Sequence, residues 1–142
     1  MKDISLIRVF GFSAVHRYWR HEWTAERNRI VFGAQADPHR HDFRAEAVVS
    51  GPIDPETGWV ADLSELDCLL DDVLGPLRDA DLNEAIPEVR RGEILPSTEE
   101  LAIWLWRNLE DRIPGRASLR RVRIWEADGL GAEVSDGGVS RG

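Results

Sequence analysis

The sequence predicts an α+β domain in which two helices cover one face of a four-stranded antiparallel sheet. Three observations support this fold class: strand-like alternation near both ends of the chain, two helical patterns in the middle, and a length that suits one domain. The chain has 142 residues, 42% of them hydrophobic, which is enough for a single core. Because strands flank the helices in the order β-β-α-α-β-β, we expect both helices on one face of the sheet.

Two long strands are predicted at the start of the domain. Apolar residues recur mainly at alternate positions from Ile4 to His16, and the alternation returns from His39 to Ser50. Since residues two apart share a face of a strand, each pattern predicts a strand with one buried side. Residues 17–33 are polar and aromatic and predict an excursion with a short helical piece. A shorter strand is expected around residues 59–61, after a connection that contains Pro and Gly.

The first predicted helix begins at Asp62, whose side chain can accept hydrogen bonds from free amides. Glu65 stands three residues later, in the position of a capping box. Leucines and a valine then recur at spacings of three and four up to Leu77. The pair Gly75-Pro76 is expected to end or kink this helix. Cys68 lies inside it and is expected to be a small packing residue.

The second helix is predicted to follow a loop over residues 78–96. It begins at Ser97, with Glu100 in the capping-box position and an apolar stripe behind them. Alternation predicts a strand at 119–127 and a weaker one near 132–134. The strands at the two ends of the chain complete the predicted sheet.

Composition limits the classes of partner. One domain over residues 1–135 is expected, with a disordered tail at 136–142. The net charge of −8, with no basic cluster, argues against nucleic acid. No apolar run is long enough for a membrane span, no secretory signal is expected, and the single cysteine suits a reducing compartment, which favours a cytoplasmic protein. Exposed edges of a four-stranded sheet favour pairing with other subunits.

Three of the four histidines are candidate metal ligands. His39 and His41 are separated by one residue, so both face the same side of a strand. His16 continues the buried parity of the first strand, and antiparallel pairing brings the end of that strand to the beginning of the second. Three neutral imidazoles with an open fourth position are typical of a catalytic zinc site. For the pair alone, a chance surface arrangement is the alternative.

Seven segments carry a resemblance to a known family. From about Phe10 to Ala127 the chain contains, in order, FSAVHRYW, NRIVFG, HRHDFRAEAVV, GWVADLSEL, DLNEAIP, PSTEELAIWLW and VRIWEA. In this order they resemble the 6-pyruvoyltetrahydropterin synthase and 6-carboxytetrahydropterin synthase family. The resemblance implies the tunnelling fold, whose subunits join their sheets into a barrel and stack as hexamers. A homo-oligomer, with the hexamer as its expected form, follows from that fold.

The resemblance also implies a site. The residues that match the family's zinc ligands are His16, His39 and His41. Glu126 matches the glutamate that grips the amino-pyrimidine edge of the pterin, where a carboxylate accepts two hydrogen bonds. Thr98 and Glu99 match a helix start that helps to hold the ring. The structural alternatives are a solvated strand end for Glu126 and helix caps for Thr98 and Glu99.

The family's proton-transfer residues are absent from their usual places. Gln35 stands where the family has its catalytic cysteine, and Arg78 and Asp79 stand where it has an Asp–His pair. Asp79 is the expected replacement base, with Asp81 and His21 behind it, and the alternative for each is an ordinary exposed loop residue. Arg78 is a candidate for binding an anionic group of the substrate.

The sequence therefore predicts a zinc-dependent lyase or cyclase of the pterin synthase type with altered acid and base residues. Its expected substrate is a pterin or related heterocycle similar to 7,8-dihydroneopterin triphosphate. The alternative is a member of the family that binds a pterin or heterocycle without turning it over. A domain that uses the barrel only for assembly is a third hypothesis, which gives the histidines no role.

Overall fold

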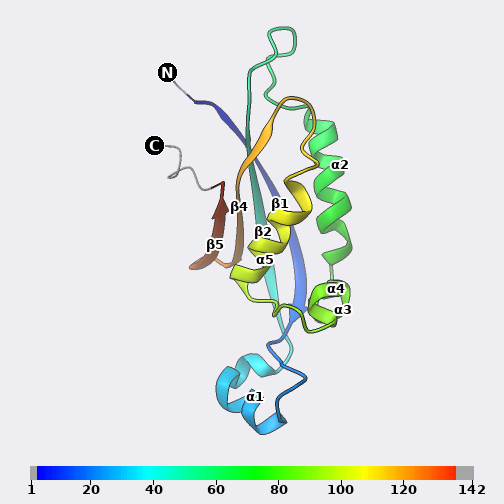
Figure 1. The fold of residues 1–142 in the computed structure, drawn as a ribbon, viewed down its shortest axis with the longest axis vertical. Coiled ribbons are helices and arrows are strands. Elements are labelled where there is room, and N and C mark those ends of the chain that lie inside the picture. Colours follow the sequence, from blue (N-terminus) through cyan, green and yellow to red (C-terminus); the bar gives the residue numbers. More distant parts are fainter. Residues whose placement is uncertain (1–2, 137–142) are drawn as a thin grey trace.

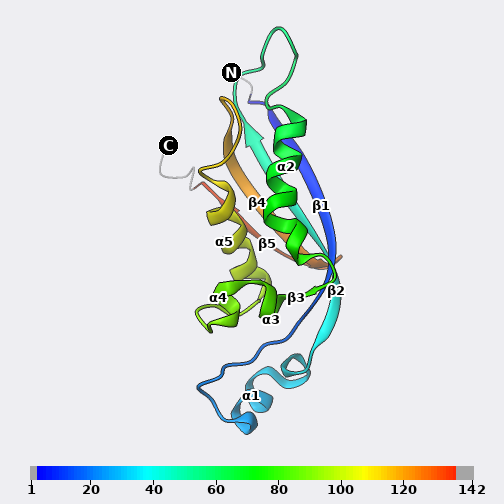
Figure 2. The same ribbon diagram turned by 90° about the vertical axis from the view of Figure 1, so that its right-hand side faces the viewer.

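The computed structural model describes residues 3–136 as one curved sheet with two long helices on one side (Figure 1). The strand order is β3-β1-β2-β4-β5. The strands are β1 (Ser5–His16), β2 (His39–Ser50), β3 (Ala80–Asp81), β4 (Ser118–Ala127) and β5 (Leu130–Ser135), and the long helices are α2 (Leu63–Leu74) and α5 (Thr98–Leu109). Figure 2 shows both helices on the inner side of the sheet's curve. The predicted α+β class is confirmed.

Antiparallel pairing of β1 with β2 decides which residues are buried. Its register places Phe12 opposite Phe43 and His16 opposite His39. Residues that face each other in this way project from the same side of the sheet. On the side that faces the helices the buried residues of these strands include Phe12, Ala14, Phe43, Ala45, Ala47 and Val49. The helices supply the other layer of the core, including Leu66, Leu69, Leu70, Leu101, Leu105 and Leu109.

Both long helices begin at the predicted capping residues. The Asp62 carboxylate accepts hydrogen bonds from two amides of the first turn of α2, at 2.9 and 3.2 Å. The Ser97 hydroxyl accepts one from the Glu100 amide at 3.1 Å. These contacts satisfy amides that have no partner inside the helix. At its other end α2 gives way to a short 3₁₀ turn, Gly75–Leu77, as the Gly-Pro pair predicts.

The sheet differs from the predicted one at an edge. β3 adds a fifth strand of two residues that pairs parallel with β1, so the sheet is mixed rather than four-stranded and antiparallel. It lies within the predicted loop 78–96, together with the short helices α3 (Leu82–Ala85) and α4 (Pro87–Arg90). The Asp79 amide begins this pairing by donating to the Ser13 carbonyl at 2.6 Å. A two-residue strand has no periodicity, so alternation of apolar residues does not reveal it.

Two smaller predictions are wrong. No strand forms at 59–61, where the chain leaves a turn in which the Asp54 amide donates to the Trp59 carbonyl at 2.9 Å. Trp59 remains 51% exposed, so its apolar character does not mark a buried strand. Cys68 is exposed rather than packed. It lies on the outer side of α2, about 200° around the helix from the buried Leu66.

The excursion after β1 forms a small lobe at one end of the sheet (Figure 1). It contains α1 (Ala25–Phe32), the predicted helical piece, and the 3₁₀ turn Gly33–Ala36. The fully buried Asn28 side chain holds the lobe together. It accepts a hydrogen bond from the Arg20 amide at 2.7 Å and donates to the Arg20 and Thr24 carbonyls at 2.9 and 3.0 Å. These bonds fix the path of the chain between β1, which carries His16, and β2, which carries His39 and His41.

Residues 137–142 of the predicted tail lie outside the described residues. Asp136, which was included in that tail, is attached to the sheet. Its amide donates to the Arg120 carbonyl at 3.1 Å, and its carboxylate pairs with the Arg120 guanidinium at 2.9 Å. Among residues 3–136, no helix is both long enough and apolar enough to cross a membrane.

Candidate metal centre

Four side chains converge at the end of the sheet next to the excursion. They are His16 from β1, His39 and His41 from β2, and Glu126 from β4, and one ligand atom from each lies within 4.8 Å of the others. The register explains the convergence. His16 pairs with His39, and His41 follows on the same face of β2. The Ile124 position of β4 pairs with Ala45, which puts Glu126 on that same face.

Backbone carbonyls orient two of the imidazole rings. The Nδ1 of His16 lies 2.8 Å from the Pro96 carbonyl oxygen, and the Nδ1 of His39 lies 2.9 Å from that of Asp37. Because a carbonyl only accepts, each Nδ1 carries the proton and donates it. The Nε2 atoms are then left with lone pairs. This arrangement is the usual support for histidines that bind a metal.

The environment keeps His16 neutral. Burial lowers the pKa of His16 to about 4, the Pro96 carbonyl opposes that shift, and His39 and His41 add to it. His16 is fully buried, and among the described residues its Nε2 has no hydrogen-bond partner. That atom lies 3.0 Å from the Oε1 of Glu126, which is also 3.5 Å from the Nε2 of His41. A lone pair that faces a carboxylate favours a cation between them, and neutral imidazole with carboxylate is a donor set that suits Zn²⁺.

Tyr18 is a member of the site that sequence reasoning missed. Its ring packs edge-on against His16, with 5.5 Å between the ring centroids. Burial, followed by the negative charges of Glu126 and Glu99, raises the pKa of Tyr18 to about 12, so its hydroxyl keeps its proton. The sequence could have indicated Tyr18 by its spacing, since it follows His16 by two residues and an extended chain places such residues on the same side. The Pro96 carbonyl was also missed, because a backbone group leaves no mark in the sequence.

The predicted ring-holding residues lie at the same end of the sheet. Thr98 is buried at the first position of α5, two residues after the Pro96 carbonyl that holds His16. Glu99 is exposed beside it and close enough to Tyr18 to influence its pKa. Ser97 is the helix cap, so the capping alternative does not account for Thr98 or Glu99.

Asp79 and Arg78 lie apart from the three histidines. Asp79 has a positive φ of 54° and an 83% exposed side chain, which pairs with Arg40 at 3.5 Å. Arg40 stands between His39 and His41 in β2 and therefore projects from the opposite face of the sheet. Arg78 pairs with Asp71 of α2 at 3.0 Å and lies over the Phe10 ring.

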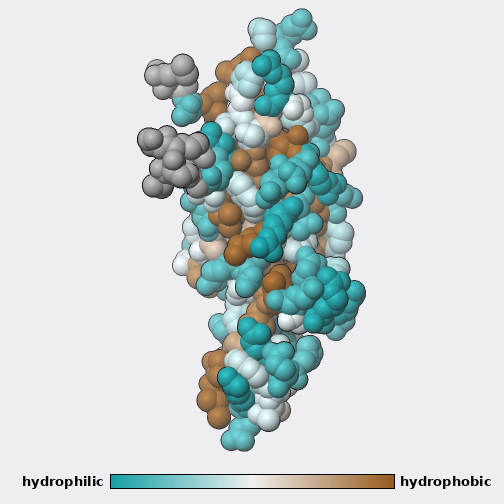
Figure 3. All heavy atoms as spheres, viewed as in Figure 1, coloured by the Kyte–Doolittle hydropathy of each residue, from teal (hydrophilic) through white to brown (hydrophobic). Residues whose placement is uncertain are grey.

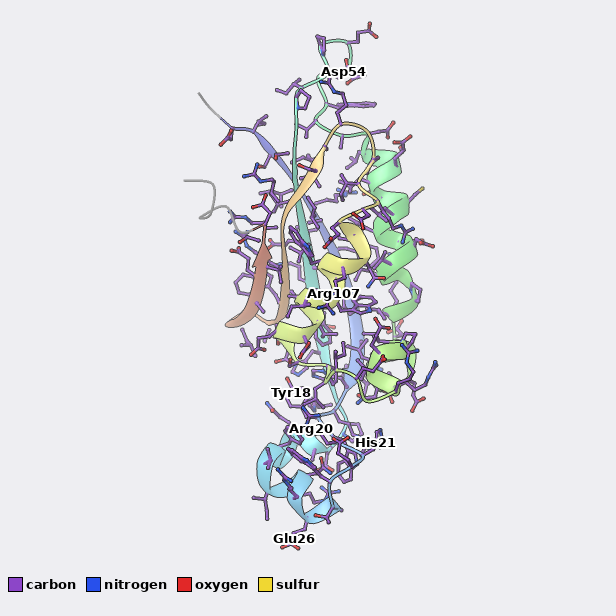
Figure 4. All side chains as sticks on the ribbon, viewed as in Figure 1. Tyr18, Arg20, His21, Glu26, Asp54 and Arg107 are labelled. Carbon is purple, nitrogen blue, oxygen red and sulfur yellow. The ribbon has the colours of Figure 1, made fainter. Side chains whose placement is uncertain are left out.

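Gln35 and His21 border the site without joining the four-residue cluster. The Gln35 carbonyl accepts a hydrogen bond from the Tyr18 amide at 2.8 Å, while its side chain is exposed. His21 lines a hollow of about 200 Å³ that also touches Pro38 and Pro96. Figure 4 shows Tyr18 and His21 where the sheet meets the excursion.

A larger hollow of about 460 Å³ lies at the far end of the molecule, around Asp54 (Figure 4). Its lining has carboxylates and an arginine but no histidine. The candidate functional site therefore lies at the opposite end, where the oriented imidazoles and the neutral, buried His16 are found.

Comparison with known proteins agrees with this geometry. The model of the family described as 6-pyruvoyl tetrahydropterin synthase matches residues 5–136. The 6-pyruvoyl tetrahydrobiopterin synthase of Poecilia reticulata is 35% identical over 127 residues, which cover 87% of this chain and 84% of that protein. The dihydroneopterin monophosphate aldolase of Pyrococcus furiosus is 28% identical over 124 residues, 87% of this chain and 90% of that protein.

A solved structure shows the same fold. The Caenorhabditis elegans 6-pyruvoyl tetrahydropterin synthase superposes with a TM-score of 0.85 at 23% identity, over 95% of this chain and 96% of the other. The family match covers nearly the whole chain, and it includes every strand and helix described above. This chain therefore belongs to the 6-pyruvoyl tetrahydropterin synthase family.

Proposed function

We propose that this protein is a zinc-dependent lyase that acts on the side chain of a reduced pterin. The observation that carries the proposal is the cluster of His16, His39 and His41, in which one ligand atom of each ring lies within 4.8 Å of the others and backbone carbonyls hold the Nδ1 atoms of His16 and His39. These three residues would hold the ion. A bound Zn²⁺ would act as a Lewis acid toward the oxygen atoms of the pterin side chain.

The chain's own residues would bind and orient the ring. Glu126 offers a carboxylate that accepts hydrogen bonds from an amino-pyrimidine edge, as the family resemblance implies. Thr98 lies close by at the start of α5, and the protonated Tyr18 supplies a hydroxyl donor at the same end of the sheet. The Phe43 ring, which packs against His16 with 5.4 Å between centroids, would limit access of water to this side of His16.

Proton transfer requires a group other than the family's thiolate. The side-chain amide of Gln35 cannot accept a proton from the substrate at neutral pH, so we propose a carboxylate base and favour Asp79. Within one subunit Asp79 lies on the opposite face of the sheet from the histidines. It would therefore serve the site of a neighbouring subunit, and each site would combine residues from two copies of the chain.

Subunit mixing tests this arrangement. His41→Ala and Asp79→Asn should each be inactive alone. In oligomers reassembled from equal amounts of both, about one quarter of the sites should combine an intact His41 from one subunit with an intact Asp79 from its neighbour. These mixed oligomers should therefore recover about one quarter of wild-type activity. No recovery after verified mixing would contradict a shared site that uses Asp79. Asp71→Asn, which also removes one exposed carboxylate, is the matched control and should stay active in unmixed form.

We propose that the subunits assemble into a hexamer through the free strand edges. Within residues 3–136, no strand covers the outer edge of β5, and β3 covers only the end of β1. Ile30 and Val31 of α1 are 74% and 54% exposed, and Figure 3 shows apolar residues gathered on that lobe. A stable monomer at micromolar concentration in light scattering would contradict the assembly and the shared site together.

The substrate we propose is a phosphorylated 7,8-dihydroneopterin. A relative is named as an aldolase for the monophosphate, so cleavage of a carbon–carbon bond of the side chain is one candidate reaction beside the synthase reactions. Incubation of the zinc-loaded protein with the monophosphate and the triphosphate, followed by product analysis, separates these reactions. Binding of both compounds without any product would favour the alternative, a non-catalytic pterin-binding member of the family.

Elemental analysis tests the metal site separately from activity. The wild-type protein should carry one zinc per subunit, and His41→Ala should lose most of it. His21→Ala is the matched control, because His21 is exposed and outside the cluster, and this variant should retain its zinc. Full zinc content in His41→Ala would overturn the proposed metal site.

A further inference from the structure

We infer that Glu126 is a fourth metal ligand in the substrate-free protein and leaves the ion when a pterin binds. This inference rests on the proposed three-histidine zinc site and adds a closed resting state to it. It differs from the role that the family resemblance implies for Glu126, which concerns the ring alone. Three features of the cluster support it: its distances, its charge balance and the competition between two uses of one carboxylate.

The distances match those between ligands of a shared ion. Ligand atoms that lie 2.0–2.1 Å from a tetrahedral Zn²⁺ are about 3.3 Å from each other. The Oε1 of Glu126 lies 3.0 Å from the Nε2 of His16 and 3.5 Å from the Nε2 of His41. These values bracket the tetrahedral separation. The carboxylate therefore already has the spacing of a ligand with respect to two of the three imidazoles.

The charge of Glu126 also needs a cation. Its side chain is only 6% exposed, and no arginine or lysine of the described part of the chain lies within ion-pair distance of it. Its near polar neighbours are the imidazoles of the three histidines and the phenol of Tyr18, none of which carries a positive charge when neutral. The His16 ring donates its Nδ1 proton to Pro96 and presents a bare Nε2 to the carboxylate. A buried carboxylate beside a lone pair is costly unless a cation bridges the two atoms.

The two uses of this carboxylate exclude each other. When the side chain of a pterin reaches the ion, the bicyclic ring lies between the ion and the amino-pyrimidine edge. An oxygen at ligand distance from His16 and His41 is then on the wrong side of the ring to grip that edge. Glu126 must rotate away from the imidazoles before it can hold the ring. The fourth position is thereby closed to other ligands until the substrate arrives.

Cobalt substitution tests the inference, because Co²⁺ reports its coordination through its visible absorption. Full-length wild-type, Glu126→Gln and Glu110→Gln proteins would be loaded with Co²⁺ and titrated with azide, a small anion that binds an open metal position. Glu110 is exposed at the opposite end of α5 from Thr98, so its variant controls for the loss of one charge. Circular dichroism would verify that each variant is folded.

We expect azide to leave the visible absorption spectra of the Co²⁺-loaded wild-type and Glu110→Gln proteins unchanged. The spectrum of Glu126→Gln should change when azide is added. Glu126→Gln should also bind Co²⁺ at least about 10-fold more weakly, in the range seen when ligand-supporting groups are lost. Addition of 7,8-dihydroneopterin should shift the wild-type spectrum. A Glu126→Gln protein with wild-type affinity, spectrum and azide response would overturn the inference alone. Wild-type Co²⁺ affinity in His41→Ala would instead overturn the metal site and the proposed function.

Discussion

The Asn83 side chain offers a direct test of how the fold holds the first histidine. Its Oδ1 accepts a hydrogen bond from the Arg17 amide at 2.9 Å, and its Nδ2 donates to the Arg17 carbonyl at 3.0 Å. Arg17 directly follows His16, so this amide clamp fixes the chain where β1 ends and the excursion begins. Asn83 belongs to α3, which the sequence pattern did not reveal, and it connects that helix to the residue after His16.

The expected cost of Asn83→Ala follows from the two lost bonds. Each contributes about 0.5–1.5 kcal/mol, so the free energy of unfolding should fall by roughly 2 kcal/mol. For a domain of this size, 1 kcal/mol corresponds to about 3 °C in Tm, so Tm should fall by about 6 °C. Because the backbone beside His16 is released, Zn²⁺ affinity should fall by about 10-fold as well.

Thermal unfolding of the metal-free protein and a Zn²⁺ titration at fixed protein concentration measure both effects. Asn108→Ala is the matched control, since this half-buried asparagine lies in the last turn of α5 and its Nδ2 donates to the Trp104 carbonyl at 2.8 Å. Alanine's higher helix propensity offsets that loss, so the control should lose less than 1 kcal/mol and keep its Zn²⁺ affinity. If Asn83→Ala behaved like Asn108→Ala in both assays, the clamp would not position His16.

Three further predictions follow from the site. Because the folded protein holds the pKa of His16 at about 4 while the unfolded chain protonates near 6.5, the metal-free protein should lose on the order of 3 kcal/mol at most as the pH falls through that window, measured by urea unfolding. His16→Gln should remove that loss, and His21→Gln should not. Gln35→Cys should restore little synthase activity in a product assay, since the Asp–His pair of the family is still missing. Tyr18→Phe should weaken 7,8-dihydroneopterin binding in a fluorescence titration by about 5-fold, the value of one hydrogen bond, and unchanged binding would remove Tyr18 from the ring pocket.

The part of the site that the sequence predicted depends on strand parity. His16, His39 and His41 meet because the antiparallel register of β1 and β2 places Phe12 opposite Phe43 and His16 opposite His39, and a slip by one residue would turn the apolar residues away from the core. The same parity, extended by β4, places Glu126 with them. Long, strongly patterned elements therefore position their side chains in a way that a single sequence can reveal.

The rest of the site depends on backbone groups and on short segments. The carbonyls of Pro96 and Asp37 orient the histidines, and any residue type supplies a carbonyl. The face on which Asp79 lies is decided by β3, which has two residues and a parallel partner. The backbone of Asp79 has a positive φ, and its side chain pairs with Arg40. The alternation of apolar residues does not predict this conformation. Family motifs identified Asp79 as a candidate, but only the fold shows that it pairs with Arg40, on the face of the sheet opposite the histidines.

A metal at this cluster would also act on stability, because its ligands come from distant parts of the chain. His16 and Glu126 are separated by more than one hundred residues, and the carbonyl that holds His16 comes from the loop before α5. An ion that joins these segments closes long loops, which removes more freedom from the unfolded chain than from the folded one. The excursion, with its ends tied by the bond from Tyr18 to Gln35, begins and ends at ligands of the same cluster. Binding of the ion should therefore order the lobe that carries α1 together with the sheet end, so that the metal site and the surface we propose for subunit contact are formed by the same event.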